Sequence, residues 1–401
     1  MYSFFMELIY ENDEIMKHAD ACAGHQSFGL VTYDLTKGGI REMKAYRAFL
    51  VVMLLAVLGI LFYSRKSERI DQTQNNHITD TDVQSLSAVS SEGDTERMVS
   101  PSGEPVGIYV KTKGVLVIAV NTVESKDGSV HSPCGDALMP GDYVMRINDK
   151  AVNDKQTMID MIENSEGREM LFRVCRDNHY FNVRVTPVEA KSGKYAIGVW
   201  VKDDISGIGT ITYIEDGQFA ALGHSINDND TGITFRVSDG ALYETTIVRI
   251  RKPEAQTPGR LEGVINYAGT HIIGRVEDNN AYGIHGYLTK RQQELRMDAP
   301  KVPVGTKEEV HTGKAYLLSA LSGEARQYEI EIISVDSDNE NGKCMEIRVT
   351  DASLIELTGG IVQGVSGTPI LQDGKLIGAV THVFVDDPTR GYGIFIEQMM
   401  Q

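Results

Sequence analysis

The sequence predicts a mainly β protein in which two small β-barrels pack together with a cleft between them, preceded by a smaller α/β unit and an N-terminal transmembrane segment. Three observations predict this architecture. A chain of 401 residues is too long for one ordinary domain. After residue 196, many short β-type runs are separated by glycine, with almost no helical periodicity before residue 351. One uninterrupted apolar run lies near the N-terminus.

The apolar run covers residues 48–63 (AFLVVMLLAVLGILFY) and has basic residues on both sides. It is slightly shorter than the ~17–25 residues of a typical spanning helix, so the hydrophobic region of a signal peptide is the alternative. No small-x-small cleavage motif follows it, and we therefore favour an uncleaved anchor over residues 48–64. The rest of the chain is then exported.

The residues before this anchor, 1–47, are an extension that can be explained in two ways. A start at Met43 would place a short basic segment directly before the apolar run, as export signals do, and Met1 would then be a misassigned start. Alternatively, the extension is a short cytoplasmic tail. After the anchor, residues 65–104 are rich in Ser, Thr, Asp, Asn and Gln, which predicts a flexible linker.

The composition limits partners and cofactors. A net charge of −17 provides no basic surface of the kind that nucleic-acid binding needs, so we expect no nucleic-acid partner. The four cysteines are widely spaced without a Cys-x-x-Cys pair, which indicates neither a zinc site nor a disulfide framework. We expect no metal and no cofactor.

Residues 105–188 alternate short β-type runs with turns and contain one helical segment near residues 155–164. The stretch Cys134–Asn148 (CGDALMPGDYVMRIN) resembles the middle of a PDZ domain. That resemblance places Gly114, Val115 and Leu116 in the loop that holds a peptide carboxylate beside an edge strand, so it implies a peptide-binding role for these three residues. The alternative is a β-rich spacer that binds nothing.

The segment Gly364-Val365-Ser366-Gly367-Thr368-Pro369 places a serine in a turn between two glycines. A serine nucleophile needs a base for its proton, and the oxyanion that it creates needs N–H donors, here those of Gly364 and Ser366. The segment resembles the nucleophile turn of chymotrypsin-like proteases, which is followed by a β-hairpin. By itself, it is equally explained as an ordinary glycine turn.

A histidine in a suitable context is the second half of the argument. His224 follows a short apolar strand in Ala221-Leu222-Gly223-His224-Ser225, which is similar to the Ala-x-His turn of the same proteases. Together with the serine turn, this predicts a base and nucleophile contributed by different barrels. His382 lies near the serine hairpin, where it either lines the cleft or packs as a strand residue.

The anchor, linker, PDZ-like unit and Gly-His-Ser-Ile turn, with the run from Thr358 to Val385, together resemble the stage IV sporulation protein B family of spore-forming bacteria. The resemblance implies that Asp351, in a Thr-Asp pair before the Thr-Gly-Gly run, is the acid of a Ser-His-Asp triad. Asp351 is alternatively the N-cap of a helix at residues 352–357.

This resemblance also implies the biological activity. It implies a serine endopeptidase on the forespore membrane, facing the space between forespore and mother cell. There the enzyme would cleave itself and a membrane-bound regulator of an intramembrane protease, so that a mother-cell sigma factor is processed. The alternative from another class is a PDZ adaptor that captures peptides without cleaving them.

Overall fold

The computed structural model describes residues 96–339 and 341–401. Within these residues, no helix is both long and apolar enough to cross a bilayer. The predicted anchor at 48–64, the extension at 1–47 and most of the predicted linker lie outside the described residues.

The last residues of the predicted linker belong to the folded structure. Met98–Pro101 form strand β1, which pairs antiparallel with β11 (Val199–Glu215) and with β18 (Val302–Pro303). The Val99 side chain is 0% exposed. The linker therefore ends before Met98, because Met98 and Val99 pair with a strand that is distant in the sequence.

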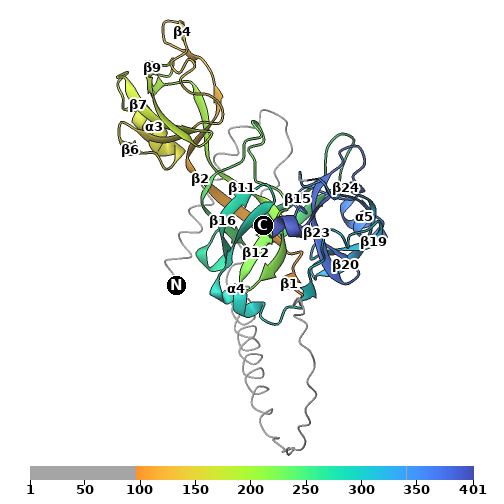
Figure 1. Cartoon of the computed structure of the whole chain (residues 1–401). Coiled ribbons are helices and arrows are strands. Elements are labelled where there is room, and N and C mark those ends of the chain that lie inside the picture. The colour runs from red at the N-terminus through yellow and green to blue at the C-terminus, as the bar shows by residue number, and fades with distance from the viewer. Residues whose placement is uncertain (1–95, 340) are drawn as a thin grey trace, which may run out of the picture. The chain divides into compact units, whose positions relative to one another are not determined.

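The first β-barrel is a ring of antiparallel pairings that closes on itself where β2 pairs with β11 (Figure 1). Alternate residues of β2, Val106, Ile108 and Val110, point into its core, as the two-residue period of a strand requires. In ring order the strands are β2 (Pro105–Val120), β11, β12 (Gln218–Ala221), β17 (Gly283–Leu288), β16 (Ile272–Asn280) and β13 (Val237–Tyr243).

The second β-barrel is also closed and is formed by the C-terminal part of the chain. Tyr328, Ile330 and Ile332 alternate into its core. The double-barrel prediction is confirmed. Its strands are, in ring order, β19 (Gly313–Ser319), β20 (Arg326–Val335), β21 (Met345–Val349), β24 (Arg390–Phe395), β23 (Lys375–Val383) and β22 (Pro369–Gln372). Outside the barrel strands lie β14 (Thr245–Arg251), β15 (Arg260–Ile265), η1 (Gly269–His271), α4 (Lys290–Leu295), α5 (Ala352–Thr358) and α6 (Ile396–Met399).

The PDZ-like unit packs one helix against a small sheet. Helix α3 (Lys155–Glu163) confirms the predicted helix, and the Asp154 side chain caps it by accepting a 2.7 Å hydrogen bond from the Thr157 N–H. Met158 and Ile162 of α3 join a core with Phe172 and Val174. The strands of this unit are β3 (Val123–Glu124), β4 (Val130–His131), β5 (Tyr143–Ile147), β6 (Lys150–Ala151), β7 (Met170–Arg176), β8 (His179–Val185), β9 (Val188–Glu189) and β10 (Tyr195–Ala196).

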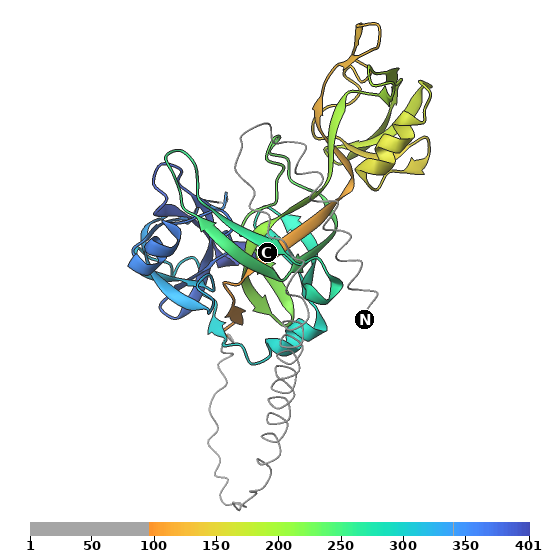
Figure 2. The same ribbon diagram turned by 180° about the vertical axis from the view of Figure 1, so that it is seen from behind.

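Two long strands, β2 and β11, belong both to the PDZ-like unit and to the first barrel, as Figure 1 and Figure 2 show from opposite sides. The start of β11 pairs with residues 116–120 of β2 in the PDZ-like unit, and its continuation pairs with residues 105–111 in the barrel. The two units therefore share strands, and the end predicted for the α/β unit at residue 188 is not a break in the fold.

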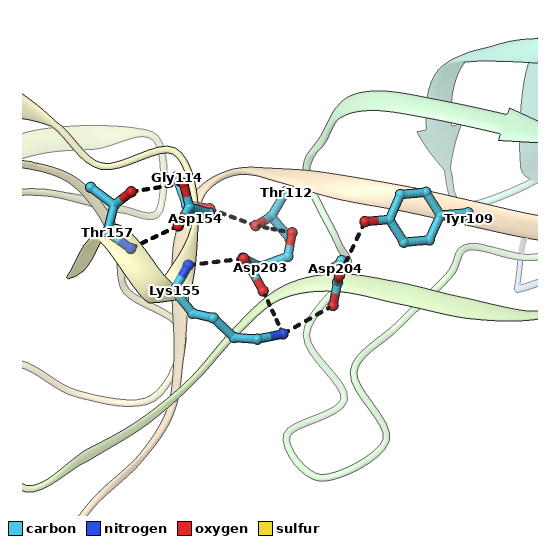
Figure 3. A network of polar contacts seen from close by, with 8 residues as sticks. All are labelled: Tyr109, Thr112, Gly114, Asp154, Lys155, Thr157, Asp203 and Asp204. Carbon is cyan, nitrogen blue, oxygen red and sulfur yellow. Dashed lines mark hydrogen bonds and ion pairs between the residues drawn. The ribbon is translucent and has the colours of Figure 1, made fainter. Parts of the chain in front are cut away.

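A polar network ties helix α3 to these shared strands (Figure 3). The Lys155 N–H donates to Asp203 of β11 at 2.9 Å, and Lys155 Nζ lies 3.0 Å from the same carboxylate. The Tyr109 hydroxyl of β2 donates to the neighbouring Asp204 at 3.1 Å. Buried Thr112 donates to the Gly114 carbonyl at 2.5 Å. These contacts join α3 directly to β11.

Candidate active site

The serine turn lies between α5 and β22 and touches the first barrel closely. Gly367 has φ +93°, and a Cβ atom there would lie 2.2 Å from the Thr210 carbonyl oxygen and 2.4 Å from the Leu222 nitrogen. Only glycine fits this conformation and this approach. The turn that carries Ser366 is therefore in backbone contact with the segment that leads to His224.

Strand β11 of the first barrel holds the serine turn by three hydrogen bonds. The Thr210 N–H donates to the Ser366 carbonyl at 3.1 Å, and the Thr210 hydroxyl donates to the Gly364 carbonyl at 3.0 Å. The Thr212 hydroxyl, which is fully buried, donates to the Gly367 carbonyl at 2.7 Å. These bonds orient the carbonyls of the turn toward β11 and fix its position between the barrels.

Two N–H groups of this turn are available to a ligand. In the described part of the chain, neither the Gly364 N–H nor the Ser366 N–H donates a hydrogen bond to another protein group, whereas those of Val365, Gly367 and Thr368 all do. Free backbone N–H groups beside a serine hydroxyl are what stabilisation of an oxyanion requires. The sequence predicted these two groups as oxyanion donors, and that role stays a prediction.

The segment before His224 has an unusual backbone. After β12 ends, both Leu222 (φ +74°) and Gly223 (φ +72°) adopt left-handed conformations. For a buried branched residue such as Leu222 this costs on the order of 1–3 kcal/mol, and such strain is concentrated at functional sites. A Cβ atom at Gly223 would lie 3.0 Å from the Thr381 methyl group, so the turn packs against β23.

The hydrogen bonding of His224 defines its tautomer. Its Nδ1 lies 2.8 Å from the Ser225 carbonyl oxygen, and because a carbonyl only accepts, Nδ1 carries the proton. Nε2 then holds a free lone pair. Burial lowers the pKa of His224, opposed by the bond to Ser225, so the imidazole is neutral at neutral pH and able to accept a proton.

The serine hydroxyl points to another acceptor in this structure. Ser366 Oγ donates to the Thr381 carbonyl at 3.0 Å, and no hydrogen bond within residues 96–339 and 341–401 joins Ser366 to His224. Rotation of the hydroxymethyl group between staggered positions would redirect it. Loose contacts between catalytic groups are common in unliganded enzymes.

His382 of β23 lies beside the candidate base. Its ring centroid is 5.5 Å from that of His224, with 41° between the ring planes. Partial burial of the ring, followed by the charges of His224 and Lys343, lowers the pKa of His382 to about 4. The sequence feature that indicated a place near the serine turn was the position of His382 next to Thr381, on the second strand of the hairpin that follows Ser366.

The structure places Asp351 at the N-terminus of α5. Its carboxylate accepts hydrogen bonds from the N–H groups of Ser353 (2.9 Å) and Leu354 (3.0 Å), as the alternative assignment predicted. The hydrogen bond from the Ser353 hydroxyl is the main cause that lowers the pKa of Asp351. In the described residues no hydrogen bond or ion pair connects Asp351 to His224, so its place in the triad stays a prediction.

The free strand edge expected beside Gly114, Val115 and Leu116 is absent from the described structure. Val115 and Leu116 pair with β5 on one side, and Leu116 pairs with Lys202 of β11 on the other. Addition of a peptide strand needs an unpaired edge, so the peptide-binding prediction for these three residues lacks its structural basis. The consecutive buried residues 115–117 are the sequence signal of a central strand.

An unpaired edge does occur at the start of β11. Within the described residues, the segment Val199–Lys202 pairs with β2 on one side and has no ladder partner on the other. It packs near α3 and follows Gly198, which has φ +75°. This unpaired strand segment beside a helix has the geometry that strand addition requires.

One protein family matches the C-terminal half of the chain. The sequence model of the family described as SpoIVB peptidase S55 matches residues 193–400, which confirms the resemblance found in the sequence. No curated protein matches the chain.

Several solved structures resemble parts of the chain. The PDZ domain of the SdrC-like protein from Listeria monocytogenes is 24% identical, with 23% of this chain and 90% of that chain covered and a TM-score of 0.19. The Rv3671c protease from M. tuberculosis is 16% identical, with 50% and 72% covered and a TM-score of 0.28. The HtrA-type protease AlgW with a decapeptide is 10% identical, with 75% and 63% covered and a TM-score of 0.29.

Proposed function

Because the chain belongs to the SpoIVB peptidase S55 family and is a serine endopeptidase, we propose that Ser366 is its nucleophile and His224 its general base. The observation that carries this assignment is the backbone contact between the two turns, where Gly367 approaches both Thr210 and Leu222. This contact supports the assignment, because a nucleophile and a base contributed by two barrels require neighbouring turns.

The proposed reaction begins when the Ser366 hydroxyl turns from the Thr381 carbonyl toward Nε2 of His224. Oγ then bonds to the scissile carbonyl carbon while its proton passes to Nε2, and the N–H groups of Gly364 and Ser366 hold the oxyanion. Collapse of this intermediate breaks the peptide bond, and Nε2 gives the proton to the leaving amine. A water molecule releases the acyl group by the same sequence of proton transfers.

The imidazolium that forms during this reaction needs a partner at Nδ1. The Ser225 carbonyl accepts a 2.8 Å hydrogen bond from the Nδ1–H group of His224, which supports this role. Asp351 is the acid that the family resemblance implies, and it would have to leave its N-cap position on α5 to reach His224. We therefore propose Ser225 as the resting partner and treat Asp351 as the acid of an activated arrangement.

The proposed biological role follows the family. We propose that the chain is anchored by residues 48–64, faces the space between forespore and mother cell, and acts during sporulation. It would cleave itself and then a membrane-bound regulator of an intramembrane protease, which leads to processing of a mother-cell sigma factor. The polar composition of residues 65–95 supports self-cleavage, because an extended polar segment is a suitable substrate.

The PDZ-like unit is proposed to control this activity by binding a peptide between β11 and α3. The support is the continuity of β11, which runs from the free edge at Val199 to Thr210 and Thr212, the residues that hold the serine turn. A peptide added to this edge would act on the serine turn through one strand and through the Asp203 contact with α3.

Mass spectrometry of the purified full-length chain tests the assignment. Incubation at neutral pH is expected to produce discrete cuts that are absent from Ser366→Ala. Ser225→Ala is the matched control, because its hydroxyl contacts Asn227 and its backbone carbonyl is retained. Full cleavage by Ser366→Ala would refute the nucleophile, whereas peptide capture by an intact wild-type chain would favour the adaptor.

A further inference from the structure

We propose that a hollow lined both by strands of the PDZ-like unit and by strands of the first barrel is a binding site for an extended acidic peptide segment of a partner protein. The site is a hollow of about 560 Å³, which we call the basic hollow. Four cationic side chains line it, from β2, β5 and β7. They are Lys111, Lys113, Arg146 and Arg173.

Strand register concentrates positive charge at this site. Arg146 of β5 lies directly opposite Arg173 of β7, and Arg173 lies opposite Asn182 of β8. Like charges directly opposite each other on neighbouring strands destabilise a sheet. A second hollow of about 360 Å³ shares both arginines and is also lined by one acid, Asp149, so two cations and one carboxylate face it. An anionic ligand lying along this row would relieve the repulsion.

None of the four cations forms an ion pair with a carboxylate in residues 96–339 and 341–401. The chain carries a net charge of −17, so carboxylates are abundant elsewhere. The single acid that lines the hollow is Asp154, whose two oxygens accept hydrogen bonds from the N–H and hydroxyl of Thr157. Lys111 lies opposite Asp204 of β11 and Asp239 of β13, so the positive charge available to a ligand is mainly that of Lys113, Arg146 and Arg173.

The shape and lining favour a peptide over a phosphate group or a membrane surface. The cations are distributed over three strands, which suits spaced carboxylates better than one compact anion. Met145 and Tyr180 also line the hollow, and Tyr180 (49% exposed) lies under the Arg173 guanidinium at 5.6 Å. Leu171, 37% exposed, lines the second hollow. An acidic segment carrying one apolar side chain matches this combination, because arginine binds carboxylates in a bidentate manner.

This site is separate from the edge between β11 and α3 and from the proposed catalytic residues. Peptide binding can be measured on Ser366→Ala, where cleavage does not interfere. Loss of binding and loss of catalysis are therefore distinguishable, and the inference does not depend on the assignment of the nucleophile.

Fluorescence polarisation with the full-length Ser366→Ala chain in zwitterionic detergent micelles tests the proposal. The probe is a labelled peptide of about twelve residues with alternating Glu and Ser and one central Tyr, compared with the same peptide carrying Gln for Glu. We expect the Glu peptide to bind at least about tenfold more tightly and to weaken about tenfold as salt rises from roughly 50 to 500 mM. Equal binding of the two peptides would overturn the proposal.

Charge variants locate the site. Arg146→Glu and Arg173→Glu are each expected to weaken binding of the Glu peptide by about tenfold or more, and the double variant should bind a Lys version of the peptide. Lys290→Glu on α4 is the control, because it changes net charge equally but lies outside the hollow. An effect of Lys290→Glu as large as that of Arg173→Glu would overturn the proposal.

Two further measurements exclude misfolding of the variants and binding of other anions as explanations of the result. Arg173→Gln removes the like-charge contact, so its Tm is expected to equal or exceed that of the parent while peptide binding falls. Inorganic phosphate at millimolar concentration is expected not to displace the Glu peptide. Displacement by phosphate, or binding of anionic vesicles in place of the peptide, would assign the hollow to a different ligand and refute the peptide proposal.

Discussion

Substitution of Gly367 by alanine probes the contact on which the site is built. The new Cβ atom would lie 2.2 Å from the Thr210 oxygen and 2.4 Å from the Leu222 nitrogen, both backbone atoms that cannot rotate away. The residue would also have to adopt φ +93°. A left-handed conformation costs about 1–2 kcal/mol for a non-glycine residue, and overpacking adds about 1–3 kcal/mol. We expect the free energy of unfolding to fall by about 2–5 kcal/mol.

The functional consequence follows from how the contact is relieved. If the chain folds, the serine turn must move away from β11, and a displacement of about 1 Å at a reacting group lowers a rate on the order of a hundredfold. Urea unfolding measures the stability change, and the rate of appearance of self-cleavage fragments measures the activity. Both should decrease together.

Gly374→Ala is the matched control for this experiment. Gly374 has φ +80° in the next turn, but a Cβ atom there meets nothing within 4 Å. Its substitution therefore carries the conformational cost of about 1–2 kcal/mol without the clash, and activity should be retained. If Gly367→Ala were as stable and active as Gly374→Ala, the proposed contact between the two turns would be wrong.

Three further predictions concern the pH dependence of stability, the buried hydroxyl of Thr212 and the carboxylate of Asp351. Burial lowers the folded-state pKa of His224 and that of His382, the latter to about 4, so the unfolded chain binds more protons below pH ~6.5. The free energy of unfolding, measured by urea titration, should therefore fall as the pH decreases from about 6.5 toward 4, and it should fall less steeply in His382→Asn. The acid limb of the pH profile of kcat/KM should lie below the ordinary histidine pKa. A free energy of unfolding that does not change over this pH range would contradict both pKa shifts. Thr212→Val leaves the Gly367 carbonyl without its donor and should cost about 1–3 kcal/mol on thermal unfolding with reduced cleavage, whereas an unchanged Tm would show that the bond is unimportant. Asp351→Ser retains an N-cap, so full cleavage activity would show that Asp351 only caps α5, while a stable but inactive variant would establish the acid.

Local chemistry explains why several features could be predicted from the sequence. Alternating apolar residues and glycine turns predicted the β-barrels, because side-chain period and turn geometry depend on neighbouring residues. The helix at 155–164 and the capping alternative for Asp351 followed from the same kind of information. The serine turn was recognisable because Gly367 must be glycine wherever the backbone approaches so closely.

The tertiary structure alone decided which strands pair and which groups meet. A single sequence segment does not show whether a strand lies at an edge: Val115 and Leu116, predicted to lie in a peptide-binding loop beside an edge strand, belong to a strand paired on both sides, while an unpaired segment lies at the start of β11. That the rings of His224 and His382 lie close together also depends on how distant parts of the chain pack, which the sequence does not show.

The sequence by itself therefore determined the mainly β class and the local cap that Asp351 provides, and it predicted the serine turn and its histidine. The tertiary structure decided how the turn is held by β11 and where positive charge gathers between the PDZ-like unit and the first barrel. The physical reason is that turn and periodicity preferences act over a few residues, whereas strand register joins residues far apart in the chain.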